Sequence, residues 1–95
     1  MEFEFSGELF HWHGPAPFHF ITVPDEQSMA IQAVASIVSY GWGAIPVLGR
    51  IGRTDFTTSL FPKGALYLVP IKVAVRRAET LELGNKVVVR LRLDT

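Results

Sequence analysis

The sequence contains no cysteine, no excess of charge of either sign and no long apolar run. Without cysteine, the chain can form no disulfide, no thiol nucleophile and no cysteine–zinc site. Nine lysine and arginine side chains balance nine aspartate and glutamate side chains, so the net charge is zero at pH 7. This balance argues against a nucleic acid as the partner, because binding a phosphate backbone needs positive charge. The absence of cysteine fits a cytoplasmic location.

The chain also lacks segments that direct a protein into or across a membrane. No apolar stretch reaches the roughly 20 residues that a membrane-spanning helix requires. The first ten residues alternate between acidic and apolar side chains, whereas a secretory signal needs a basic start and an unbroken apolar core. The 95 residues are 48% apolar and 19% charged, which is a globular composition. We expect a single β-barrel domain over residues 1–95, without membrane insertion.

The chain contains one pattern twice: a strand, a proline, a helix, a glycine turn and a second strand. The first copy spans residues 18–51 and the second spans residues 66–93. Apolar side chains recur at i, i+3, i+4 and i+7 after Pro24, which is typical of one face of a helix. We expect helices over about 25–39 and 71–78. The side chains expected in the core are Ile31, Val34, Val38, Val73, Val87, Val89 and Leu91.

Short strands account for most of the rest of the chain. Residues 2–12 alternate between apolar and polar, as a strand with one buried face does, and Gly7 predicts a bend within it. Further strands are expected at 18–23, 44–51, 54–61, 65–69 and 86–93. Many short strands favour a small closed or split barrel with helices at its ends, because closure hides the strand edges. The expected fold is mainly β with two helices: a single-chain double-split β-barrel, a pseudo-barrel capped by helices.

The second copy of the pattern resembles a motif of known transcription regulators. Its sequence, LVPIKVAVRRAETLELGNKVVVRL, is similar to the swapped-hairpin motif of AbrB-type regulators. In that motif a strand runs into a proline, a short basic helix, a glycine-led turn and a final strand. Asn85 stands where those proteins usually carry aspartate. The resemblance implies a nucleic-acid-binding regulator that would use Arg76 and Arg77, an alternative that the two glutamates following them weaken.

A wider resemblance spans nearly the whole chain. The segments FSGELFHWHGPAPFHFITVP, GWG, SLFPK and IKVAVR resemble the pattern of DUF1905, a small bacterial family known only as a domain of unknown function. The resemblance implies a double-split β-barrel in a single chain and brings no reaction. Some relatives carry this domain fused to a YdeI/OmpD-associated domain, so such a domain is an expected partner by fusion or association. His11 departs from the family's usual residue before the first tryptophan, so the resemblance assigns it no role.

Several residues together predict a site for a small anion. Trp42 lies between two glycines, which let the backbone place its ring where it can line a pocket. Ser59 and Lys63 border one hairpin end, and Arg50 and Lys72 lie nearby if the barrel closes as expected. A hydroxyl and cations suit a carboxylate or a phosphate, and free backbone N–H groups at the start of the second helix would add to Lys72. The alternative is a tryptophan packed in the core and solvated polar groups.

Metal binding and catalysis find little support in the sequence. His11, His13 and His19 lie close together and imidazole is a common zinc ligand, but no acidic or cysteine partner stands at a suitable spacing. We therefore predict no metal site and no cofactor. The chain has no serine–histidine–carboxylate order, no glycine-rich phosphate loop and no catalytic carboxylate pair, so no catalytic residue is predicted. We expect a small non-catalytic binding or accessory domain; an enzyme that uses the same pocket is the weaker alternative.

Overall fold

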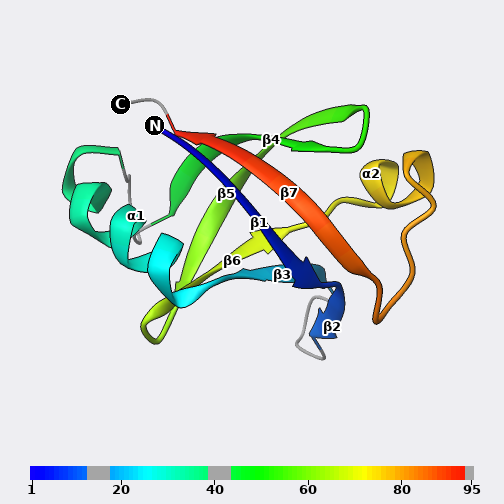
Figure 1. The fold of residues 1–95 in the computed structure, drawn as a ribbon, viewed down its shortest axis with the longest axis horizontal. Helices are drawn as coiled ribbons and strands as arrows, with labels where there is room; N and C mark the ends of the chain where they lie inside the picture. The colour runs from blue at the N-terminus through cyan, green and yellow to red at the C-terminus, as the bar shows by residue number, and fades with distance from the viewer. Residues whose placement is uncertain (13–17, 39–43, 94–95) are drawn as a thin grey trace.

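The computed structural model describes residues 1–12, 18–38 and 44–93. These residues form seven strands and two helices (Figure 1). In chain order the elements are β1 (Glu2–Glu8), β2 (Phe10–Trp12), β3 (Phe18–Val23), α1 (Asp25–Val38), β4 (Ile45–Ile51), β5 (Thr54–Lys63), β6 (Leu66–Pro70), α2 (Val73–Ala78) and β7 (Lys86–Leu93). The predicted mainly β fold with two helices is confirmed.

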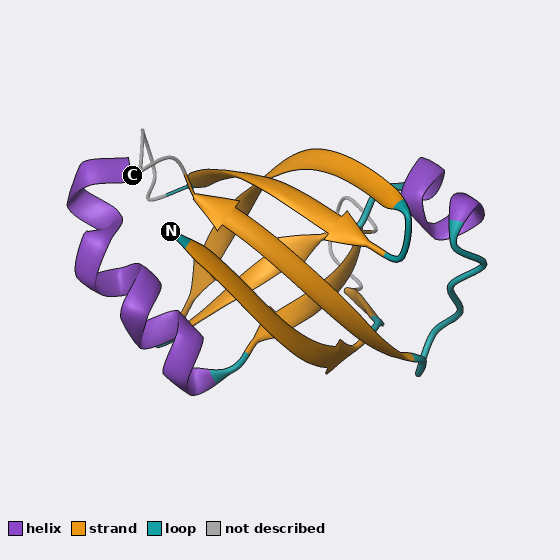
Figure 2. Cartoon of the chain, turned by 45° about the horizontal axis from the view of Figure 1, so that its top comes forward, coloured by secondary structure: helices purple, strands orange, loops and turns teal. Residues whose placement is uncertain are grey.

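The strands join one antiparallel sheet in the order β1-β7-β4-β5-β6-β3-β2. The sheet curls into a half-barrel, with α1 and α2 at opposite ends (Figure 2). β1 and β2 follow each other in the chain but form the two edges of the sheet, so the chain crosses between the edges at Leu9. There the Leu9 N–H donates to the Asn85 carbonyl over 2.9 Å, and the Gly84 N–H donates to the Leu9 carbonyl over 2.9 Å. This crossing brings the edges together.

The first strand ends earlier than the sequence alternation predicts. The alternation indicates one strand over residues 2–12 with a bend at Gly7, whereas the strand breaks at Leu9 and Gly7 stays within β1. Gly7 is needed for a different reason, because β1 passes close to β3 at this point. A Cβ atom on Gly7 would lie 2.7 Å from the Ile21 Cγ2 atom. A glycine therefore allows the two strands to approach each other.

The two copies of the sequence pattern pair with each other strand by strand in the sheet. β3 pairs with β6 and β4 pairs with β7, so each strand of one copy lies beside its counterpart in the other. Pro24 follows β3 directly, and Pro70 is the last residue of β6. In each copy the chain leaves the sheet at the proline and enters a helix at one end of the half-barrel (Figure 1). The repeat in the sequence is therefore also a repeat in the structure.

The first helix, α1, forms where the apolar period predicts it. Ile31 is fully buried, and Val34 is partly buried against the core. The side chain of Val38 lies outside the described part of the chain. Ser28 is also fully buried, and its hydroxyl donates to the Val23 carbonyl over 2.9 Å, which satisfies the polar group. Neither helix in the described residues is long and apolar enough to cross a membrane.

The second helix, α2, begins at Val73, two residues later than predicted. Ile71 therefore belongs to the extended segment before the helix and is buried there, while Val75 is the buried side chain of the helix itself. Val73 lies two residues before Val75, which places it on the opposite face of a helix. It is 48% exposed, so the prediction that Val73 lies in the core is wrong.

Strand β5 is longer than predicted and contains Pro62. The sequence suggests a strand that ends at Phe61, but β5 continues to Lys63 and the turn lies at Gly64, which has a φ of 61°. The ladder with β4 ends at Leu60, so this last part of β5 pairs with β6 alone. A proline is tolerated there because one side of the strand has no ladder to complete.

The buried apolar side chains form one cluster beneath the curled sheet and against both helices. Val87, Val89 and Leu91 are buried as predicted, because they alternate along β7 with side chains that face outward. Val88, between two of them, is 56% exposed.

Replacing Val89 by alanine should lower the free energy of unfolding by about 1–3 kcal/mol, because a fully buried side chain is shortened and a cavity remains. The matched variant Val88→Ala removes the same atoms from the outer face of β7. It should change the free energy by about 0.5 kcal/mol or less. Denaturant midpoints of both variants check this, and equal midpoints would contradict the burial of Val89.

Candidate functional site

The sheet splits between β5 and β6. Their ladder joins residues 61–63 of β5 to residues 66–68 of β6 and goes no further. Beyond it, β5 runs beside β4, while β6 pairs with β3 and ends at Pro70. Pro70 has no N–H group and cannot extend a ladder toward β5. The two strands therefore diverge, and a cavity lies between them.

This cavity has a volume of about 460 Å³. Strands β3 and β5 supply one part of its lining, and the segment from Pro70 into α2 supplies the other. The lining residues are Phe18, His19, Phe20, Thr58, Ser59, Phe61, Pro70, Ile71, Lys72, Val73 and Arg76. A cavity of this volume falls within the range that holds small organic ligands in proteins. It is called the split cavity below.

The segment that carries α2 is held at both ends. Before the helix, the Ile71 N–H donates to the His19 carbonyl over 2.8 Å and so continues the contact between β6 and β3. After the helix, the Thr54 hydroxyl donates to Glu79 Oε2 over 2.6 Å, which ties the segment to the start of β5. Because both ends are fixed, the lining side chains of α2 have a defined position relative to β3 and β5.

Two cations line the split cavity from this segment. Lys72 is the N-cap residue of α2. Arg76 lies one turn further, and its backbone N–H donates to the Lys72 carbonyl over 3.1 Å. Lys72 is exposed, whereas Arg76 is half-buried. The Arg76 Nε atom is buried and has no hydrogen-bond partner among the described residues. An unsatisfied buried donor costs about 1–3 kcal/mol. This atom is enclosed by protein, so Arg76 acts on the cavity through its lining position and its positive charge.

His19 is kept neutral beside Arg76. Burial lowers the pKa of His19, and the positive charge of Arg76 and the neighbouring His11 lower it further. His11 is the cross-strand partner of His19, and their ring centroids are 5.0 Å apart. A neutral imidazole presents one donor and one acceptor nitrogen. The positive charge of the split cavity at pH 7 therefore comes from Lys72 and Arg76.

Apolar side chains surround these polar groups. Phe18, Phe61 and Val73 are 54%, 49% and 48% exposed, although all three are large and apolar. Phe20 is buried and packs edge-on against Trp12, with ring centroids 6.4 Å apart. Exposed apolar side chains that gather around a hollow are typical of a ligand or partner site.

The residues that the sequence predicts as an anion site do not all meet. Ser59 and Lys72 line the split cavity together. Lys63 lies elsewhere on β5 and places its Nζ atom 3.6 Å from the centroid of the Trp12 ring. Arg50 lines a different groove, and Trp42 lies outside the described residues. The helix α2 has only six residues, so we assign no anion site to its backbone N–H groups.

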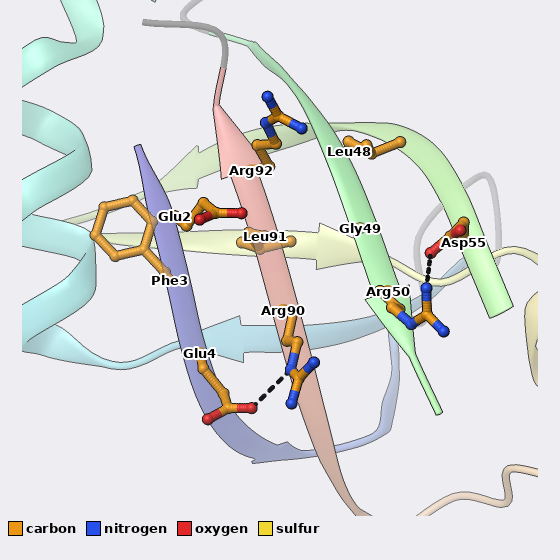
Figure 3. Close-up of a pocket in the computed structure, with 10 residues that line it drawn as sticks. All are labelled: Glu2, Phe3, Glu4, Leu48, Gly49, Arg50, Asp55, Arg90, Leu91 and Arg92. Carbon is orange, nitrogen blue, oxygen red and sulfur yellow. Dashed lines mark hydrogen bonds and ion pairs between the residues drawn. The ribbon is translucent and has the colours of Figure 1, made fainter. Parts of the chain in front are cut away.

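Arg50 belongs to a groove on the outer face of β1, β7 and β4 (Figure 3). Arg50 and Arg90 are cross-strand partners, but each guanidinium turns to an acidic side chain. Arg90 Nε lies 2.8 Å from Glu4 Oε1, and Arg50 Nη1 lies 3.3 Å from Asp55 Oδ1. Such exposed pairs stabilise a fold by about 0–1 kcal/mol each. Because acidic groups match the arginines here, the groove offers an anion less net attraction than the split cavity does.

Several lining residues of the split cavity could not be singled out from the sequence. From the sequence, Arg76 is considered only as a nucleic-acid contact and His19 only as a metal ligand. Nothing in the sequence marks Phe18 or Phe61 as site residues. These residues meet because β3 and β5 flank the same end of β6, which is a long-range feature. Pro70 was the one local feature that pointed to the cavity, because a proline cannot continue a hydrogen-bonded ladder between strands.

The structure also places residues that were considered for metal binding and for nucleic-acid binding. No group of three or more histidine, aspartate or glutamate side chains in residues 1–12, 18–38 and 44–93 could hold a metal ion. His11 and His19 lie side by side, and His13 lies outside this part of the chain. Of the two arginines predicted to contact a nucleic acid, Arg76 lines the split cavity and Arg77 is exposed on α2.

The curled sheet, its two end helices and the split cavity define a small β-barrel-like protein. The family described as a domain of unknown function, DUF1905, matches residues 5–91, and the chain belongs to this family. No curated protein matches the chain. The family match confirms the wider resemblance seen in the sequence. The likeness of the second copy to the AbrB-type motif stays a prediction.

Proposed function

We propose that the protein is a small binding or accessory domain that holds a small anionic ligand in the split cavity. The observation that carries the proposal is the placement of Lys72 and Arg76 on one side of a largely apolar cavity. No acidic side chain is among its described lining residues, so the positive charge is not cancelled locally. Thr58 and Ser59 are also among the lining residues, and a hydroxyl donor suits a carboxylate or phosphate oxygen.

A nucleic-acid ligand has less support. Arg76 is half-buried against the cavity, which leaves Arg77 as the exposed arginine of α2. Nucleic-acid affinity arises from several phosphates neutralised together, and one exposed arginine on a chain of zero net charge supplies little of it. A cytoplasmic location and association with a YdeI/OmpD-associated type of domain remain part of the proposal, on the composition and the resemblance respectively.

Replacing Lys72 by glutamine should weaken the binding of a small anion about ten-fold, because one charge-assisted contact is lost. The melting temperature should stay nearly unchanged, since Lys72 is exposed. A ligand-detected NMR screen of small carboxylates and phosphates identifies the anion, and calorimetry then measures its affinity for each variant.

The control for this experiment is Lys86→Gln, which removes an equal charge at the start of β7, away from the cavity. It should leave the affinity nearly unchanged. Equal losses in the two variants would mean that only overall charge matters and would contradict the site. A large fall in melting temperature for Lys72→Gln alone would show a structural role instead. If no anion in the screen binds, the proposal is wrong.

A further inference from the structure

We infer that the ligand of the split cavity is a carboxylate attached to a flat apolar body, such as an aromatic monocarboxylate, rather than a phosphate. This inference rests on the function proposed above and names the chemical class of its ligand. It is carried by three features of the cavity: its apolar lining, its single half-buried cation and its exposed aromatic rim.

The lining is mainly apolar. Six of the eleven lining residues are apolar, and they come from β3, β5 and the α2 segment: Phe18, Phe20, Phe61, Pro70, Ile71 and Val73. An apolar body in the cavity would contact them from more than one side, and removing that surface from water favours binding. Phosphate is strongly hydrated and would gain nothing from these walls, while its own desolvation would oppose entry.

The half-buried charge suits one carboxylate. The guanidinium of Arg76 is planar and presents parallel N–H donors to two oxygens that lie in one plane, as those of a carboxylate do. Arg76 lines the cavity and is half-buried, so water screens its charge only in part. Lys72 is exposed, so water screens it more strongly. A monoanion would neutralise Arg76 without placing a second negative charge in an apolar cavity.

The volume and the rim favour a flat body of roughly one or two rings. A cavity of about 460 Å³ is larger than acetate or phosphate can fill. Phe18 of β3 and Phe61 of β5 both line it and remain about half exposed. Aromatic rings prefer offset-stacked or edge-to-face contacts, and a flat aromatic ligand would cover these two rings in that way.

The test compares four probes on the full chain by isothermal titration calorimetry at pH 7: 2-naphthoate, acetate, inorganic phosphate and the neutral naphthalene-2-carboxamide. We expect 2-naphthoate to bind at least about ten-fold more tightly than acetate or phosphate, because only it buries an apolar body. We also expect it to bind about ten-fold more tightly than the carboxamide, because only it carries the charge.

The other outcomes separate this inference from the proposed function. If phosphate or acetate binds as tightly as 2-naphthoate or more tightly, the ligand class is wrong while an anion site stands. If the carboxamide binds as tightly as 2-naphthoate, no anion is recognised and both are wrong. Absence of binding by all four probes likewise contradicts both.

Matched variants locate the binding. Phe61→Ala should weaken 2-naphthoate binding about five- to ten-fold, because part of the apolar contact is lost. Leu48→Ala should leave it unchanged, since Leu48 is similarly exposed, at 45%, but lies on the outer face of β4. Circular dichroism checks that both variants are folded. If 2-naphthoate binds both variants as it binds the wild type, it does not occupy the split cavity and the inference is wrong.

Discussion

Replacing Leu60 by alanine should lower the free energy of unfolding by about 2–5 kcal/mol. Leu60 is fully buried and is the last residue of β5 that pairs with β4, whereas Phe61 already pairs with β6. Its side chain therefore fills the core where the two parts of the sheet separate. Close-packed neighbours there can collapse into the gap only if one part of the sheet shifts. Chemical denaturation gives the free energies.

The control for Leu60 is Leu48→Ala, which removes the same atoms from a half-exposed side chain on the outer face of β4. Surface substitutions of this kind change the free energy by about 0.5 kcal/mol or less. The difference between the two variants therefore isolates the effect of burial. Similar losses in both would place Leu60 outside the core.

Replacing Arg76 by glutamine should weaken the binding of 2-naphthoate by about 10–100-fold, because the half-buried cation that faces the carboxylate is lost. The same change should raise the pKa of His19 toward its ordinary value. Burial is the main cause that lowers this pKa, and the positive charge of Arg76 is the second. NMR titration of the His19 ring protons measures the pKa, and calorimetry measures the affinity.

The control for Arg76 is Arg77→Gln, which removes an equal charge from the neighbouring residue of the same helix. Arg77 is exposed and does not line the split cavity. Both the affinity and the pKa of His19 should stay close to those of the wild type. An equal rise of this pKa in the two variants, or no rise in either, would contradict the placement of Arg76 beside His19.

Local periodicity was sufficient to predict most elements of the fold. The alternation from Val87 to Leu91 defined the buried face of β7, and the apolar period around Ile31 defined the inner face of α1. Each depends only on residues a few positions apart. The predicted start of α2 was two residues too early. Because of this error Val73 was expected in the core, whereas it lies on the surface. On a helix, two residues are enough to reverse the face.

The arrangement of the strands in the sheet could not be predicted in the same way. The crossing at Leu9 and the split between Leu60 and Phe61 of β5 depend on which strands become neighbours and where each ladder stops. This is why the residues predicted for the anion site do not all share one cavity. Ser59 and Lys72 line the split cavity, while Arg50 lies on the outer face of the sheet. The residue types indicated which ligand chemistry a site could have. The pairing of the strands determined which of these residues line the same cavity.

The most direct test of an anion site in the split cavity is an NMR titration of the isotope-labelled protein with 2-naphthoate. We expect the largest amide shifts at Ser59, Lys72 and Arg76, which line the cavity. The amides of Leu48 and Arg90, on the outer face of the sheet, should change little. Shifts that centre on the outer face, or that show no saturating change around the cavity, would contradict the account.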